Sequence, residues 1–388
     1  MKSILYLLAT LFILSSIATI KAQEYYFPER YETWKTAEKN QFKLDAQQLN
    51  KAVDFAKANQ YSGSSDLRRA ILKGFEREPF HEILGPTKKR GGPAGMILKN
   101  GYLLASWGDT QRVDMTFSVT KSFLSTVAGL AEDQGLIKSI TNKVANYVWD
   151  GTFDGEHNSK ITWEHLLQQN SDWSGELWGL KDWADRPPRE GGLDDWRFRK
   201  LNEPGTVMEY NDVRVNVLSY SLTNVWRKPL PLVLKEELMD KIGATPTWRW
   251  YGYDHAWTVI DGMQMKSVTG GGHSGAGLFI CTEDMARFGM VFLNNGRWKD
   301  QQLISEDWIK KATTPSVPNV NYGYMWWLNQ KGGSRHWEGV PQHVFYAAGF
   351  GGNFIVVDQK NDLLIVTRWL EPSKIGEFVK QVYEAFKD

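Results

Sequence analysis

The chain has 388 residues, and its 46 basic and 45 acidic side chains leave a formal net charge of +1. This balance excludes the strongly basic surface by which proteins bind nucleic acid or an anionic membrane. A hydrophobic content of 42% is enough for a large core, so the length predicts one large domain or two closely packed ones. The 18 tryptophans fit core and cleft-wall positions better than a dedicated sugar-stacking surface.

The first residues have the pattern of a secretory signal. A basic start precedes an apolar run over residues 4–20, and the small residue Ala22 follows at a suitable cleavage point. We predict a signal peptide over 1–22 and an exported, periplasmic or secreted protein, with no membrane span in the mature chain. Ala18 is a second cleavage candidate, and an uncleaved anchor is the alternative. The single cysteine, Cys281, excludes an internal disulfide.

The first half of the chain contains three clear predicted elements. Residues 44–60 have apolar side chains at helical spacing. Two apolar runs, 94–98 and 102–106, flank Asn100-Gly101, a dipeptide typical of a tight β-hairpin. Residues 118–134 form a helix that is apolar nearly all round, which indicates a helix buried at the centre of the fold.

The second half begins with an irregular stretch. Residues 142–270 are rich in tryptophan, glycine and charge, and only short helices, such as 163–168 and 213–226, are expected there. Regular elements then return as helices over 282–294, 305–313 and 374–386 and a hairpin of strands 354–357 and 363–367. The order predicts an α/β (α+β) fold: an antiparallel sheet built from both chain ends, flanked by helices, with a mostly helical inserted subdomain.

Ser118 and Lys121 are the strongest candidates for chemistry. They lie three residues apart at the start of the apolar helix, so the hydroxyl and the amine share one face, one turn apart. Serine needs a base within hydrogen-bond reach, and lysine can act as this base if burial and nearby positive charge lower its pKa. A Ser-x-x-Lys tetrapeptide arises by chance roughly once in a chain of this length, so the neighbouring segments carry the argument.

Five segments, in chain order, resemble motifs of the serine β-lactamase and penicillin-binding-protein superfamily. They are the nucleophile segment 117–123, the helix-opening segment 161–167, the second motif within 204–212, the stretch 275–294 and the third motif 347–352. The resemblance covers residues 45–388. It is strongest to the class C β-lactamase-like esterases and the 6-aminohexanoate-oligomer hydrolases. It implies a β-lactamase/DD-peptidase-like fold and a serine hydrolase, for which we expect no cofactor.

The resemblance also suggests a domain organisation. A signal peptide, 1–22, and an N-terminal arm, 23–43, precede one hydrolase domain over 44–388. Within this domain the sheet-containing region is formed by 44–141 and 271–388. The insert is formed by 142–270.

The second motif implies a catalytic tyrosine. Tyr210 of the sequence Tyr210-Asn211-Asp212 takes the place of the tyrosine that lies over the serine in this superfamily. Cations near a phenol stabilise its phenolate, which can then carry the proton to the leaving group. Asp212 departs from the usual asparagine. A carboxylate there either pairs with Lys121 and holds it protonated, which shifts the base role to Tyr210, or caps the next helix.

The third motif departs further, because Ala347-Ala348-Gly349 replaces the usual Lys-Thr-Gly or His-Thr-Gly. Small residues suit a strand that lies edge-on to a substrate. We therefore predict that Gly349 lines the site and that the backbone N–H groups of Ser118 and Phe350 form an oxyanion hole. The missing cation favours an ester or a small amide over β-lactams and D-Ala-D-Ala peptides. Three residues are candidates to replace it: Arg335, Arg368 and His343.

Gly272-His273-Ser274-Gly275-Ala276 is close to the G-x-S-x-G turn of α/β-hydrolases. Its last residue is Ala276, and a polar glycine-rich loop precedes it instead of a buried strand, so we interpret it as a tight connection near the sheet. The seven histidines lack the spacing typical of metal sites, and no metal ion is predicted. Four tryptophans of the insert either pack within it or line the substrate pocket: Trp173, Trp178, Trp183 and Trp196.

Together these patterns predict an exported serine hydrolase that cleaves a small-molecule ester or amide through a Ser118 acyl-enzyme. One alternative is β-lactamase or D-Ala-D-Ala peptidase activity at the same serine. Another is a non-catalytic penicillin-binding-like or cell-wall-binding module. The sequence leaves the substrate and the oligomeric state open.

Overall fold

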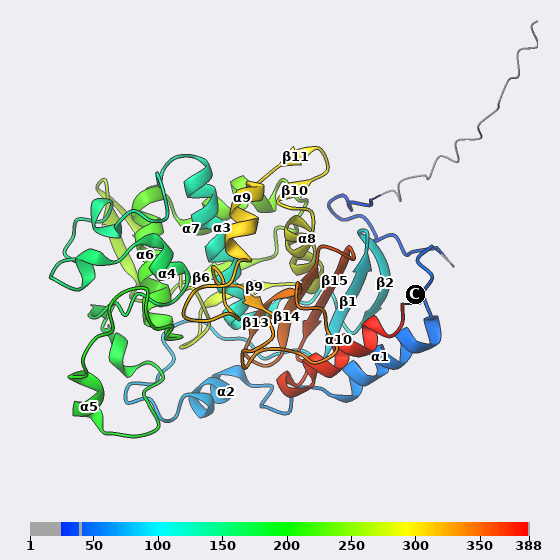
Figure 1. The fold of residues 1–388 in the computed structure, drawn as a ribbon, viewed down its shortest axis with the longest axis horizontal. Helices are drawn as coiled ribbons and strands as arrows, with labels where there is room; N and C mark the ends of the chain where they lie inside the picture. The colour runs from blue at the N-terminus through cyan, green and yellow to red at the C-terminus, as the bar shows by residue number, and fades with distance from the viewer. Residues whose placement is uncertain (1–24, 39–40, 387–388) are drawn as a thin grey trace, which may run out of the picture.

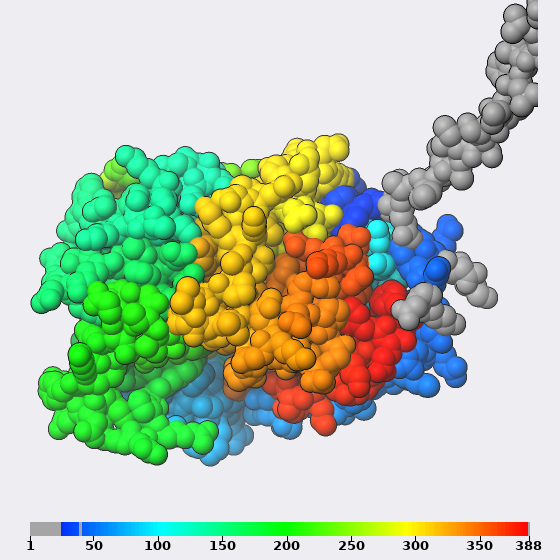
Figure 2. Space-filling model, in the orientation of Figure 1, coloured from blue at the N-terminus to red at the C-terminus, as the bar shows by residue number. Residues whose placement is uncertain are grey.

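A computed structural model describes residues 25–38 and 41–386 of the chain, so the predicted signal peptide lies outside the described residues. Figure 1 shows the main sheet and its helices on one side of the molecule and the insert, in green, on the other. The same division is visible on the surface in Figure 2. Among the described residues, no helix is long and apolar enough to cross a membrane.

The main sheet has six antiparallel strands and contains both ends of the domain, as predicted. Their order is β12-β13-β14-β15-β1-β2. The strands are β1 (Ala94–Lys99), β2 (Tyr102–Trp107), β12 (Trp327–Leu328), β13 (Phe345–Gly349), β14 (Asn353–Asp358) and β15 (Leu363–Arg368). Residues distant in sequence meet where β1 pairs with β15, with Ile97 opposite Ile365. The β1–β2 hairpin turns at Asn100 and Gly101, both with positive φ, as the dipeptide predicted.

Helices cover both faces of this sheet. The helices α1 (Ala46–Ala58) and α10 (Ile375–Tyr383) pack on one face, and α3 (Thr120–Asp133) and α8 (Thr282–Leu293) lie on the other. Side chains of a strand point alternately to its two faces. In β1, Ile97 packs with the α1 and α10 side, while Met96 and Leu98 pack with the α3 and α8 side. Phe123 of α3 stacks on Phe288 of α8, with ring centroids 3.6 Å apart. The central helix is thus buried, as its composition predicted.

A smaller sheet connects the main sheet region to the insert. Its strands run in the order β3-β9-β6, which are Asp114–Met115, Gly277–Ile280 and Arg249–Tyr251. A 3-10 turn, η1 (Phe117–Val119), follows β3 directly and leads into α3. This sheet therefore fixes the start of the central helix, where the candidate nucleophile lies.

The insert contains the expected short helices and also strands that the sequence analysis did not predict. Its helices are α4 (Trp163–Leu167), α5 (Leu193–Arg197), α6 (Asp212–Trp226) and α7 (Leu230–Leu234), with a π-helical turn η5 (Lys235–Met239). Its strands besides β6 are β4 (Glu176–Leu177), β5 (Leu180–Lys181), β7 (Trp257–Ile260) and β8 (Met263–Lys266). These are two short hairpins without a long alternating pattern, which explains why they were missed.

The remaining elements are short. They are α2 (Leu67–Gly74), α9 (Glu306–Ala312), β10 (Arg297–Trp298), β11 (Gln301–Gln302) and the 3-10 turns η2 (Val144–Asn146), η3 (Asn158–Lys160), η4 (Asp182–Ala184) and η6 (Pro372–Lys374). The described part of the N-terminal arm lies along β2, where the Trp34 indole donates to the Gly101 carbonyl at 2.7 Å.

Candidate active site

Ser118 lies in the η1 turn, where the chain leaves the small sheet and enters α3. The Thr116 N–H donates to the Leu278 carbonyl at 2.9 Å and fixes the turn to β9. Phe117 then adopts φ +52°, a conformation that is rare for a bulky residue and costs about 1–3 kcal/mol. Phe117 and Val119 are buried, whereas Ser118 is only half-buried. The strained turn therefore leaves the hydroxyl accessible on an otherwise buried segment.

Lys121 contacts Ser118 directly. Its Nζ donates to Ser118 Oγ at 2.9 Å, and its side chain is only 1% exposed. The same ammonium donates to Asp212 Oδ1. Burial alone would lower the pKa of Lys121, but the Asp212 carboxylate and Tyr210 together outweigh this effect, and the pKa lies above its ordinary value. Of the two alternatives for Asp212, the structure therefore has the pair that holds Lys121 protonated.

Asp212 is shared between three cationic side chains. Besides Lys121, its Oδ2 lies 2.5 Å from Arg186 Nη2 and 3.4 Å from His273 Nδ1. Burial alone would raise the pKa of Asp212, but the surrounding cations hold it well below its usual range. The helix-cap alternative is wrong, because the N-cap of α6 is Asn211, whose side chain accepts from Arg214 N at 3.0 Å.

Tyr210 presents its ring to the same cations. Lys121 Nζ lies 4.8 Å and the Arg186 guanidinium carbon 5.3 Å from the ring centroid. Trp327 of β12 stacks on the ring at 5.8 Å, and Tyr322 meets it edge-on at 6.3 Å. The structure thus brings Ser118, Lys121 and Tyr210 together from two distant segments.

The third motif approaches the nucleophile turn through its backbone. A Cβ on Gly349 would lie 2.0 Å from the Thr116 carbonyl oxygen and 3.2 Å from the Val119 nitrogen. Only glycine fits this contact, so β13 ends directly against η1. Phe350 follows, and its ring centroid lies 5.0 Å from that of Phe117. This position is consistent with an oxyanion hole at the Ser118 and Phe350 N–H groups, which remains a prediction.

The glycine-rich loop contributes a residue that the sequence analysis did not select. Ser274 is buried and its carbonyl accepts from Leu84 and Gly85, as expected of a tight connection. His273, however, reaches into the site, and its Nε2 lies 2.6 Å from Glu78 Oε2. Burial alone would lower the pKa of His273, but the nearby carboxylates of Asp185, Asp212 and Glu78 raise it to about 9.

Three of these side chains have atoms that could hold a metal ion. Ligand atoms of Glu78, Asp185 and His273 lie within 4.8 Å of one another. The His273–Glu78 contact of 2.6 Å is a hydrogen bond, and Asp185 Oδ1 is paired with Arg186 Nη1 at 2.6 Å. We therefore interpret the group as a network of charged hydrogen bonds. It borders a small cavity of about 30 Å³ that Asp212 also lines.

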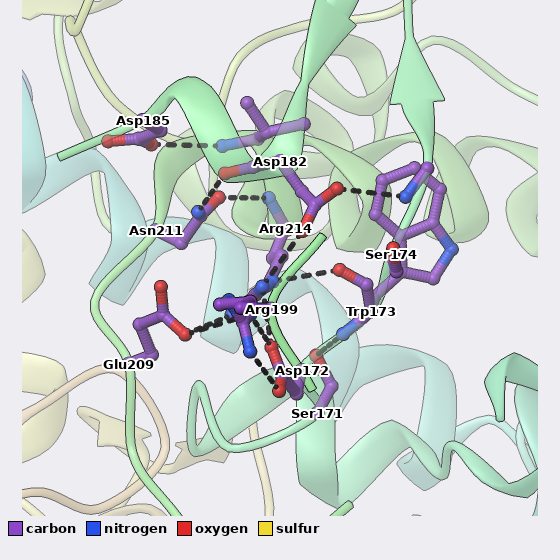
Figure 3. A network of polar contacts seen from close by, with 12 residues as sticks. Ser171, Asp172, Trp173, Ser174, Asp182, Asp185, Arg199, Glu209, Asn211 and Arg214 are labelled. Carbon is purple, nitrogen blue, oxygen red and sulfur yellow. Dashed lines mark hydrogen bonds and ion pairs between the residues drawn. The ribbon is translucent and has the colours of Figure 1, made fainter. Parts of the chain in front are cut away.

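A second ionic network fixes the motif that carries Tyr210 and Asp212 (Figure 3). At its centre is Arg214 in the first turn of α6, whose side chain is 2% exposed. Its guanidinium donates to Glu209, to Asp182 and to the Trp173 carbonyl at 2.9–3.0 Å and pairs with Asp172 at 2.7 Å. The segment before the motif and the segment around η4 are thereby held on the same helix end.

Comparison with known proteins shows the family to which the chain belongs. The family profile described as Beta-lactamase matches residues 106–368, which include all the site residues selected from the sequence. The chain belongs to the beta-lactamase family. Its members are serine hydrolases, and this chain is therefore a serine hydrolase of that family.

Individual relatives are more distant. The "Putative D-alanyl-D-alanine carboxypeptidase" of Escherichia coli O157:H7 is 26% identical over 196 residues, 42% of this chain and 45% of the relative. The chain thus matches less than half the length of that curated relative. A family VIII carboxylesterase superposes with a TM-score of 0.57 at 17% identity, covering 88% of this chain and 98% of the other. The "Putative 6-aminohexanoate-dimer hydrolase" of Bacillus anthracis gives 0.55 at 16% identity, covering 93% and 88%. These two likenesses show the shared fold.

None of the three proposed replacement cations contacts Asp212 or Tyr210 in the described structure. Arg368 is buried and donates to the Met115 and Ile280 carbonyls, and His343 pairs with Asp358 at 2.7 Å. The Arg335 guanidinium lies over Trp327, the ring that stacks on Tyr210, at 4.5 Å from the Trp327 centroid. Arg186, the cation found in the site, lies in no recognisable motif, and only the folded chain brings it there.

Proposed function

We propose that this serine hydrolase is exported and cleaves an ester or a small amide through an acyl-enzyme on Ser118. The observation that carries the proposal is the 2.9 Å contact between Lys121 Nζ and Ser118 Oγ, with the Tyr210 ring against the same ammonium. A serine, a buried base and a second proton carrier in contact are what nucleophilic catalysis requires.

In the proposed mechanism, Ser118 Oγ attacks the carbonyl carbon and its proton passes to the Lys121–Tyr210 pair. The same pair then gives this proton to the leaving oxygen or nitrogen as the carbonyl–leaving-group bond breaks. Because Lys121 is held protonated by Asp212, Tyr210 takes the larger share of the proton transfer. The N–H groups of Ser118 and Phe350 stabilise the oxyanion, which is worth about 3–4 kcal/mol per donor. Water then releases the acid.

Two observations favour a simple ester or amide over a β-lactam or a D-Ala-D-Ala peptide. The third motif has alanines where better-known members carry a cation. Arg186, the cation nearest to Tyr210 besides Lys121, is already paired with Asp185 and Asp212. The E. coli relative is named as a carboxypeptidase, so peptidase activity remains the second candidate. A non-catalytic module would gain nothing from a buried ammonium beside a serine, since burying a charge is costly.

The test is hydrolysis of short-chain p-nitrophenyl esters and labelling by a fluorophosphonate probe. We expect Ser118→Ala to abolish both, because no nucleophile remains. Ser274→Ala, which removes the serine of the glycine-rich loop, is the matched control and should retain both. Labelling that persists in Ser118→Ala, or is lost in Ser274→Ala, would refute the assignment.

The substrate class and export need separate measurements. A panel of esters, linear amides, β-lactams and D-Ala-D-Ala peptides should give turnover with the first two classes. Expression of the full chain should give a product whose N-terminus begins at Gln23, after cleavage behind Ala22. An intact N-terminus on a cytoplasmic product would contradict export.

A further inference from the structure

Arg186 follows η4 in sequence and lies against the first turn of α6. Its backbone N–H donates to Glu78 Oε1 at 3.1 Å. Next to it, Asp185 Oδ2 accepts from the N–H groups of Asp212 and Val213 in the first turn of α6. The guanidinium pairs with Asp185 Oδ1 at 2.6 Å and with Asp212 Oδ2 at 2.5 Å. These contacts fix the charge over the Tyr210 ring, while the side chain remains 30% exposed.

The charges of this cluster balance. Three side chains are cationic, Lys121, Arg186 and protonated His273, and three are anionic, Glu78, Asp185 and Asp212. Asp212 alone would lock the Lys121 ammonium in an ion pair, and such a pair cannot accept the proton of Ser118. Arg186 contacts both Asp212, the partner of Lys121, and the Tyr210 ring. Its charge therefore acts on both Lys121 and Tyr210, the two proposed proton acceptors.

We propose that Arg186 is a positioning residue of the reaction: its fixed positive charge lets the Lys121–Tyr210 pair take up the Ser118 proton at neutral pH. The inference rests on the proposed function, because it assigns to Arg186 a part in the activation of Ser118.

Removal of Arg186 should make uptake of the Ser118 proton harder at neutral pH, whether Lys121 or Tyr210 is the base. Burial and the Arg186 guanidinium both lower the pKa of Lys121, whereas Asp212 and Tyr210 raise it. Removal of Arg186 would therefore make Lys121 hold its proton more strongly. A phenolate at Tyr210 would lose a stabilising cation 5.3 Å from its ring. His273, Glu78 and Asp185 face the same cluster from the other side and, with His273 protonated, carry one net negative charge together.

The first experiment measures the pH dependence of kcat/KM for a p-nitrophenyl ester. In Arg186→Met we expect the acid limb to move to higher pH by roughly one unit, which is a tenfold loss at any pH on that limb. Arg186→Lys, which keeps the charge, should restore most of the wild-type profile. Arg189→Met is the matched control, since Arg189 is exposed on the same segment and has no ion pair among the described residues. Asp212→Asn should move the limb to lower pH.

The second experiment is independent of turnover. NMR titration of lysine labelled with carbon-13 at Cε, with Lys121 assigned from a Lys121→Met spectrum, follows its protonation in the full chain. The pH at which Lys121 titrates should rise in Arg186→Met and stay unchanged in Arg189→Met. An unchanged value in Arg186→Met, or a profile that Arg186→Lys fails to restore, would overturn the inference. Failure of the proposed function would appear differently, as an unlabelled Ser118 in the wild-type protein.

Discussion

The Lys121–Asp212 pair illustrates how single residues set the chemistry of this site. Both side chains are almost fully buried, and a buried pair is stabilising only when its geometry and additional hydrogen bonds are good. Here Ser118, Arg186 and His273 supply the further partners. The pair also depends on Gly271, because the glycine-rich loop passes so close to Lys121 and Asp212 that a side chain at this position would have no room.

Gly271→Ala tests this dependence. A Cβ at Gly271 would lie 2.6 Å from Asp212 Oδ1 and 2.8 Å from Lys121 Nζ, closer than carbon atoms approach such groups, so the pair must move. We expect kcat/KM for a p-nitrophenyl ester to fall about 100-fold, since misplacement of catalytic groups by roughly 1 Å has effects of this size. Gly92→Ala is the control, because a Cβ at Gly92 meets nothing within 4 Å. Equal activities of the two variants would contradict this account.

At the scale of elements, the beginning of α6 organises the site. The segment before it supplies Tyr210, its first residue is Asp212, and its first turn carries Arg214. Arg214 binds the loops that precede the helix in sequence, including the loop that leads to Arg186. The position of Tyr210 is thus set by buried ion pairs and not by the helix alone.

Arg214→Met should show how much this network stabilises the protein. The substitution leaves Asp172 and Asp182 buried with one cation fewer, and breaking a buried pair typically costs about 3–5 kcal/mol. The measurement is the free energy of unfolding in urea at neutral pH. Arg69→Met, at an exposed position of α2, provides the control and should change stability by less than about 0.5 kcal/mol. A similarly small change in Arg214→Met would rule out a structural role for the network.

At the scale of the whole molecule, the sequence predicted local features well. Asn100-Gly101 specified a hairpin, and Ser118 and Lys121 met because one helical turn separates them. Both signals are contained in a few consecutive residues. Tyr210 could be placed only through the order of the family motifs.

Arg186 and His273 could not be placed from the sequence at all. They come from loops without a repeating pattern, and only the pairing of distant segments brings them to Asp212. The hairpins of the insert were missed for another reason: their strands are adjacent in sequence but too short to show an alternating pattern. The predictions failed where several separate chain segments converge, because sequence periodicity reports on one element at a time.

Because β1 and β15 pair in the centre of the main sheet, the two chain ends and the active site should unfold together. Phe378→Ala tests this. Phe378 of α10 is fully buried, 5.6 Å from the Trp107 ring and on the sheet face opposite α3, and its truncation should cost about 3–5 kcal/mol. β13, β14, β15 and β1 are neighbours in the sheet, so this damage should reach Gly349 and η1. We expect the midpoint of thermal unfolding by circular dichroism and the temperature of inactivation to fall by the same several degrees.

The control is Phe198→Ala, at a residue 71% exposed in the insert, which should change neither of these temperatures. If activity in Phe378→Ala persisted above the unfolding of the sheet, the site would be an independent unit.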